Sequence, residues 1–167
     1  MLPGWRDVRI VCRAAMTIAH IYISPEHNFV GHHGVPPGEV PMVEVDHVEC
    51  VTGMGLRGDR YFGFKENYKG QATLFSLEIF ERLCEQMQVA HRDPSVFRRN
   101  IIVSGVDLNA LIGQEFEIQG VRFVGTQECS PCHWMDHAFA EGAELALKGH
   151  GGLRARILSD GVLRRGL

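Results

Sequence analysis

The sequence lacks an unbroken apolar run, an excess of charge of one sign and a regular cysteine framework. Its first 15 residues carry four charged side chains, which excludes the apolar segment of a signal peptide or membrane helix. Lys and Arg number 17 against 20 Asp and Glu, so there is no basic field for nucleic acid. The 5 cysteines form an odd, irregularly spaced set, which favours a reducing compartment. We therefore expect a cytoplasmic protein without structural disulfides and with neither nucleic acid nor membrane as a partner.

The length and composition predict one globular domain. With 167 residues, of which 45% are apolar, the chain is large enough for one hydrophobic core and shows neither a repeat nor a linker. Met16 precedes a segment of β-branched and aromatic residues, Thr17–Ile23, that is typical of a strand. We therefore expect an N-terminal extension over residues 1–15 and the domain over residues 16–167.

Short alternating segments predict most of the remaining structure to be β. They are residues 42–51, residues 100–104, a hairpin over residues 116–124 that turns at Gln119-Gly120, and a last strand over residues 153–157 closed by Asp160-Gly161. Two helices are also expected. Apolar residues recur every three or four positions after the N-cap residue Ser76, and a second helix is predicted near residues 139–148, before Gly149. The pattern indicates a mainly β, antiparallel, barrel-like domain with a few helices.

Two loops contain residues that could contact a ligand. The loop over residues 24–41 holds His27, His32 and His33, but it has no cysteine or carboxylate at a metal-binding spacing, so a solvated loop is favoured over a metal site. In residues 53–61, glycines flank Arg57 and Arg60, which would suit either anion binding or an exposed hairpin turn. The Gly-Lys-Ser/Thr ending of a phosphate-binding P-loop is absent.

The segment Cys129-Ser130-Pro131-Cys132-His133 is the strongest chemical signal, because it places two thiols and an imidazole within five residues. Haem attachment would require export, and disulfide exchange would require a βαβ setting, whereas a hairpin precedes this pair. Zinc would need four ligands, of which Cys129, Cys132 and His137 would supply three without a second Cys-x-x-Cys. Molybdenum, which accepts soft thiolate ligands, is a further interpretation.

Five ordered motifs resemble the MOSC domain, named for the C-terminal domain of molybdenum cofactor sulfurases, and in particular its stand-alone bacterial members. They lie at residues 55–61, 99–108, 111–113, 129–132 and 151–158 with Gly161, so the resemblance runs from about Met16 to the end. It implies a β-barrel-like domain that binds the pterin-based molybdenum cofactor. The chain ends in Arg164-Arg165-Gly166-Leu167 where members commonly have Gly-Asp, and it has no room for the additional N-terminal β-barrel domain of the larger relatives.

The resemblance also implies roles for individual residues. Cys132 matches the cysteine that is the protein ligand to molybdenum in amidoxime-reducing relatives, and Cys129 matches a less essential neighbour. We accordingly expect Cys132, but not Cys84 on the first predicted helix, to open into a pocket. Arginines are expected to contact the pterin or its phosphate. The candidates, in order of preference, are Arg98, Arg99 and Asn100, then Arg57 and Arg60, then Arg154 and Arg156.

Three classes of function are compatible with these residues. The first is a molybdenum-dependent oxidoreductase that reduces N-hydroxylated or related N–O compounds, with Cys132 as the metal ligand and a redox partner protein as the electron donor. The second is a sulfur carrier that passes a Cys132 persulfide to a metal–sulfur centre. The third is a non-catalytic cofactor carrier, and a structural zinc-binding module is the generic alternative.

Overall fold

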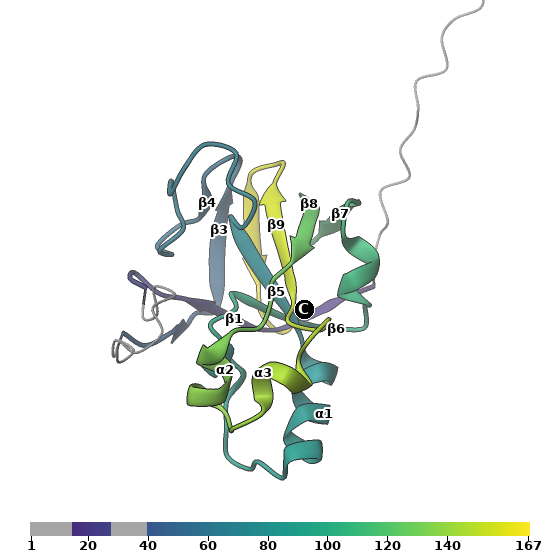
Figure 1. The fold of residues 1–167 in the computed structure, drawn as a ribbon. Coiled ribbons are helices and arrows are strands. Elements are labelled where there is room, and N and C mark those ends of the chain that lie inside the picture. Colours follow the sequence, from purple (N-terminus) through teal and green to yellow (C-terminus); the bar gives the residue numbers. More distant parts are fainter. Residues whose placement is uncertain (1–14, 28–39) are drawn as a thin grey trace, which may run out of the picture.

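A seven-stranded mixed sheet is the larger of the two sheets in the computed structural model, which describes residues 15–27 and 40–167 (Figure 1). In spatial order its strands are β2 (Val43–Glu44), β1 (Thr17–Ile23), β6 (Ile101–Ser104), β5 (Ala72–Ser76), β9 (Leu153–Ile157), β8 (Val121–Glu128) and β7 (Glu115–Ile118). A second sheet has the order β10 (Gly161–Arg164), β3 (His47–Val51) and β4 (Gly55–Leu56). The predictions for residues 1–14 and for His32 and His33 lie outside the described residues.

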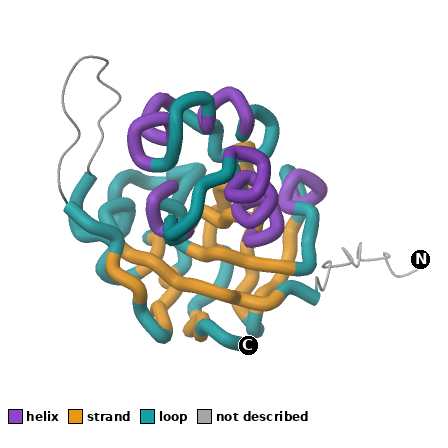
Figure 2. The backbone as a smooth tube through the Cα atoms, turned by 90° about the horizontal axis from the view of Figure 1, so that it is seen from below, coloured by secondary structure: helices purple, strands orange, loops and turns teal. Residues whose placement is uncertain are grey.

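The helices gather on one side of the strands, as Figure 2 shows from below. They are α1 (Leu77–Met87), α2 (His133–Ala138) and α3 (Ala143–Ala146), with short 3-10 helices η1 (Pro94–Phe97) and η2 (Leu108–Leu111). In the described part of the chain no helix is both long and apolar enough to cross a membrane.

The prediction of a mainly β fold with a few helices is confirmed, but the sheet is mixed. β5 and β6 pair in parallel, because α1 and η1 connect them as a crossover, and a parallel pair cannot be joined by a tight hairpin. Within residues 15–27 and 40–167, no strand pairing joins the edge strands β2 and β7. The expected barrel is therefore not closed.

Strand β5 separates two hydrophobic clusters, because all of its side chains are buried. Leu74 belongs to a cluster formed mainly by the strands, whereas Phe75 belongs to one formed with the helices, where its ring contacts Phe97 at 5.3 Å between centroids. A strand that is covered on both faces has no face in water, so apolar and polar residues do not have to alternate along it. The fold thus brings the helices against the same strands that border the candidate site.

The local signals for α1 and for the hairpin are confirmed. Ser76 Oγ accepts a hydrogen bond of 3.2 Å from Ile79 N and so begins α1 as its N-cap. Gln119 and Gly120 both have positive φ, 48° and 81°, as the tight turn between β7 and β8 requires.

The predictions for the C-terminal part were partly wrong. In place of one helix near residues 139–148 there are two short ones, because α2 begins directly after Cys132 and Gly142, with φ of 90°, interrupts the helical path before α3. The chain also continues beyond Asp160-Gly161 into β10, which pairs with β3. That pairing is long-range, so local sequence gave no sign of it.

Candidate functional site

A cavity of about 260 Å³ lies where the loop between β8 and α2 meets β5 and β9. Cys129 and Cys132 line it, and four of its lining residues are arginines: Arg60, Arg98, Arg99 and Arg154. Among the described residues that line it there is no aspartate or glutamate. The cavity therefore combines two thiols with an excess of positive charge.

The two cysteines that line the cavity belong to the loop between β8 and α2. Figure 1 shows the course of this part of the chain. Cys129 follows the end of β8, donates its backbone N–H to Gly152 O at 2.8 Å and is only 4% exposed. Cys132 is the extended N-cap residue of α2 and is partly exposed. Cys132 thus opens into a pocket, as expected.

The other two described cysteines do not line the cavity. Burial raises the pKa of Cys50, on β3, to about 12. Burial also raises the pKa of Cys84, on α1, and the charge of Glu81 adds to this effect. Both are therefore protonated thiols near neutral pH and serve as packing groups.

Arg99 holds the cysteine loop in place. Its guanidinium donates hydrogen bonds of 3.0 Å to the carbonyl oxygens of Cys129 and Gly151 and to that of Phe97, with a longer one of 3.4 Å to Ser130 O. Arg99 is only 8% exposed, and these backbone carbonyl groups are the acceptors of its guanidinium. Arg99 therefore positions the loop.

Arg98 has a similar role on the opposite wall. Its guanidinium donates to Val40 O at 2.7 Å, Glu26 O at 2.9 Å and Ser24 Oγ at 3.1 Å. Burial, followed by the charge of Arg60, lowers the pKa of Arg98 to about 10. Arg98 thus joins two described segments that are separated along the chain.

Arg60 forms a sequestered ion pair with Asp59, with 3.2 Å between Arg60 Nη1 and Asp59 Oδ1. Its Nη2 donates to Arg98 O at 3.0 Å. Asp59 also accepts a hydrogen bond of 3.1 Å from Asn100 Nδ2. The amide oxygen of Asn100 accepts from both N and Oγ1 of Thr73, so Asn100 is fully used within the protein and does not line the cavity.

Arg154 is the cavity arginine that contacts a thiol. Cys129 lies close enough to its guanidinium to raise the pKa of Arg154. Burial lowers the pKa of Arg154, but interactions with Cys129, Tyr68 and Tyr61 together raise it by more, so that the net pKa lies above the ordinary value. This contact places a fixed positive charge beside the buried sulfur.

The remaining two arginine candidates lie outside the cavity lining. Arg57 is exposed and pairs with Glu49, with 2.6 Å between Arg57 Nε and Glu49 Oε2. Arg156 lies on β9, two residues beyond Arg154. Four of the predicted residues therefore line the cavity with Cys132: Arg60, Arg98, Arg99 and Arg154. The other three, Arg57, Asn100 and Arg156, do not line it.

Sequence reasoning missed the aromatic wall of the cavity. Tyr61 and Tyr68 stack with 5.2 Å between ring centroids, and His27 meets Tyr61 edge-on at 4.8 Å. On the other side, Trp134 Nε1 donates to Val96 O at 2.6 Å. Aromatic residues recur at positions 61, 64 and 68, but this spacing does not distinguish a ligand wall from core packing.

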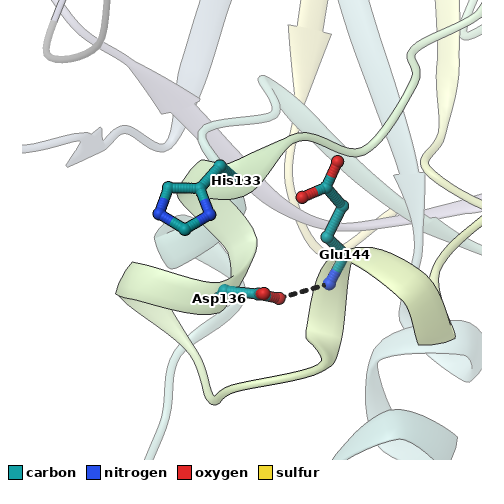
Figure 3. Close-up of side chains that lie close together, drawn as sticks. All are labelled: His133, Asp136 and Glu144. Carbon is teal, nitrogen blue, oxygen red and sulfur yellow. Dashed lines mark hydrogen bonds between the residues drawn. The ribbon is translucent and has the colours of Figure 1, made fainter. Parts of the chain in front are cut away.

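Zinc binding by the cysteine pair has no support in the described residues. There, the only group of three side chains that could hold a metal ion is His133, Asp136 and Glu144, whose ligand atoms lie within 4.8 Å of one another (Figure 3). Asp136 Oδ1 accepts a hydrogen bond of 2.7 Å from Glu144 N, so this carboxylate joins α2 to α3. Cys129, Cys132 and His137 do not converge into such a group.

Comparison with known families decides the classification. The sequence profile of the MOSC domain matches residues 32–166. The chain belongs to the MOSC domain family. This family is associated with molybdenum-cofactor binding. No curated protein matches the chain.

Solved structures with this fold include other MOSC proteins. The YuaD protein from Bacillus subtilis superposes with a TM-score of 0.68 and 20% identity over 89% of this chain and 91% of that one. YiiM from Geobacillus stearothermophilus gives a TM-score of 0.65 with 16% identity over 90% of this chain and 72% of that one. YiiM from Escherichia coli gives 0.56 with 16% identity over 84% of this chain and 65% of that one. At these identities, the similarity shows that this MOSC chain has the same fold.

Proposed function

We propose that the cavity binds the pterin-based molybdenum cofactor, with Cys132 as the protein ligand to the metal. The observation that carries the proposal is that Cys132 lines one cavity together with four arginines, with no carboxylate among the described residues of the lining. Thiolate is a soft ligand that suits such a metal, and guanidinium groups suit an anionic cofactor. The membership of the MOSC family supports the same assignment.

The residues around the cavity fit this ligand in three respects. Cys132 is partly exposed and can reach a bound metal, whereas Cys129 is buried against Arg154. The stacked Tyr61 and Tyr68 offer flat surfaces to a planar ring. Arg154 lines the cavity beside Cys129 and carries five N–H donors that can serve an anion.

We further propose that the protein is an oxidoreductase that reduces N-hydroxylated or related N–O compounds. When bound, the cofactor supplies the two-electron chemistry, in which an N–OH group with two electrons and two protons gives N–H and water. The chain contributes the thiolate of Cys132, the positive charge of the arginines that line the cavity, which favours an anionic cofactor, and the aromatic wall that borders the substrate. Electrons come from a separate redox protein.

The test begins with anaerobic purification from a host grown with molybdate. Molybdenum and the oxidised pterin derivative are measured on the same sample, and an N-hydroxylated amidine is then offered with reduced methyl viologen as the electron donor. We expect both components in near-equal amounts and formation of the amidine. Metal-free protein without pterin would refute cofactor binding, and loaded protein without turnover would leave a cofactor carrier.

A sulfur carrier is the second candidate, favoured by the presence of two thiols in one cavity. In that case the Cys132 thiolate would attack the outer sulfur of a persulfide donor and become a persulfide itself, with release of the donor thiolate and in the absence of bound metal. Mass spectrometry of the intact chain after incubation with such a donor would show the added sulfur.

A further inference from the structure

The cysteine loop also borders a second cavity, of about 450 Å³, whose charge is opposite to that of the first. Its described lining includes three carboxylate residues and one lysine: Glu128, Asp136, Glu144 and Lys148. Ser130 lines both cavities. A hollow with an excess of negative charge raises the local concentration of cations.

Two of these carboxylates form a group with an imidazole. His133 and Asp136 lie three residues apart on α2, and therefore on one face of this helix, whereas Glu144 comes from α3 (Figure 3). One possible ligand atom from each of the three lies within 4.8 Å of the others. The group contains none of the residues that the sequence suggested as zinc ligands.

The three side chains can close around a metal ion with small movements. Ligand atoms held tetrahedrally at about 2.1 Å from Zn²⁺ lie roughly 3.4 Å apart, so no pair has to approach by more than about 1.4 Å. Asp136 Oδ1 accepts its hydrogen bond of 2.7 Å from Glu144 N, which orients this carboxylate, and a carboxylate has lone pairs on both oxygens for further partners. His133 is exposed, so an ion can enter from solvent.

The donor set favours one class of ion. An imidazole with two carboxylates suits a borderline metal such as Zn²⁺ better than Mg²⁺ or Ca²⁺, which prefer oxygen ligands alone. Three protein ligands leave the fourth tetrahedral position for water. The cation also offsets the repulsion between two neighbouring carboxylates.

We infer that His133, Asp136 and Glu144 form a binding site for a divalent metal ion of the Zn²⁺ class that joins α2 to α3. Because α2 begins directly after Cys132, an ion that fixes α2 against α3 also holds the end of the cysteine loop. The site lies outside the lining of the first cavity and does not depend on the molybdenum cofactor.

The first test measures Zn²⁺ binding to the cofactor-free, chelator-treated chain by isothermal titration calorimetry. Wild type and Cys132→Ser are titrated in parallel, so that zinc bound by the cysteine pair is recognised. We expect one equivalent of Zn²⁺ that Cys132→Ser retains. His133→Gln, Asp136→Asn and Glu144→Gln should each weaken its binding by at least about tenfold, because even a residue that only orients a metal ligand is worth about 10–100-fold in affinity.

Two matched controls lie in the same part of the chain. His137→Gln removes an exposed imidazole one turn further along α2, and Glu141→Gln removes an exposed carboxylate between α2 and α3. Neither residue belongs to the group, so both variants should bind Zn²⁺ like the wild type. Asp136→Asn keeps an oxygen that can accept from Glu144 N, and circular dichroism verifies that each variant is folded.

The second test follows the effect of the ion on the two helices. Zn²⁺ should slow amide hydrogen exchange in both α2 and α3, because its ligands come from both, and should raise the midpoint of thermal unfolding. Mg²⁺ at the same concentration should do neither.

Four results would overturn the inference. They are no binding of Zn²⁺, equally tight binding by the three ligand variants, loss of all binding in Cys132→Ser, and an equal effect of Mg²⁺ and Zn²⁺. The third would assign the zinc to the cysteine pair, and the fourth would show that the imidazole of His133 is not a ligand.

Discussion

Arg99 Nη2 donates a hydrogen bond of 3.0 Å to the carbonyl oxygen of Cys129, a residue 30 positions further along the chain. The same guanidinium reaches Gly151 O, which precedes β9. One buried side chain therefore ties the segment before β6 to the cysteine loop and to the approach of β9. The positions of both thiols depend on it.

Arg99→Gln should destabilise the protein by about 2–4 kcal/mol, because several buried carbonyl groups lose their donor at once. Urea denaturation followed by circular dichroism would measure the change. Arg57→Gln is the matched control, and we expect it to change stability far less, because its ion pair with Glu49 is exposed and screened by solvent. Equal effects of the two substitutions would contradict the role of Arg99.

Gly151→Ala should displace the cysteine loop. A Cβ atom at this position would lie 2.3 Å from Cys129 O and 2.8 Å from Pro131 N, which are backbone atoms that cannot rotate away. We expect a loss of stability of at least about 2 kcal/mol, within the range known for overpacking. Gly149→Ala, where no atom lies within 4 Å but φ is 82°, should cost only the strain of about 1 kcal/mol. Thermal unfolding of both variants gives the comparison.

Cys132→Ser should abolish retention of molybdenum and leave the fold intact, because a hydroxyl is a hard and weakly acidic ligand. Cys129→Ser should have a much smaller effect on metal content, and Cys84→Ser, away from the cavity, should have none. Metal analysis of the purified variants, with circular dichroism as the folding control, makes the comparison. Retention of molybdenum by Cys132→Ser would remove this residue as the ligand.

The stability of the protein should depend on Asp93 at low pH. Burial raises the pKa of Asp93. Hydrogen bonds from Ser95 and from the Tyr22 hydroxyl, the latter at 2.8 Å, lower the pKa by more than burial raises it, so the net pKa lies below the ordinary value. A carboxyl group whose pKa is depressed by folding stabilises the protein above the pKa of the unfolded chain, about 4. This contribution is lost as the pH falls through the lower, folded value.

Asp93→Asn removes that contribution while keeping an N-cap side chain on η1. The difference in free energy of unfolding between wild type and variant should therefore be largest near neutral pH and shrink as the solution is acidified below about pH 4. Urea denaturation over a pH series measures it. A difference that stayed constant would show that the Asp93 charge is not involved.

Local signals predicted the elements whose determinants lie close together in sequence. Ser76 begins α1, and Gln119-Gly120 turns the hairpin, because a cap and a tight turn each depend on a few adjacent residues. The parallel pairing of β5 with β6 and the strand β10 were missed. Both depend on contacts between distant segments, which alternation alone does not encode.

The candidate site could be predicted only in part, again because some of its features depend on contacts between distant segments. The sequence indicated the cysteine loop and its arginines, and Cys132 lines the cavity with four of them. It did not indicate that Arg98 and Arg99 donate to backbone carbonyls, or that Asn100 is saturated by Thr73. A guanidinium that binds an anion and one that binds carbonyl oxygens look alike in a sequence, because the difference lies in the path of the surrounding backbone.

Every acceptor of the Arg99 guanidinium is a main-chain oxygen, so Arg99 recognises the path of the cysteine loop and is indifferent to its side chains. Ser130, whose side chain is exposed, contributes only its carbonyl group to this contact. The exposed side chain of Ser130 can therefore be exchanged without loss of these hydrogen bonds, provided that Gly151 and the buried Cys129 are kept. Arg99 thus gives protein engineers a fixed frame on which the side chain at position 130, which faces the cavity, can be varied.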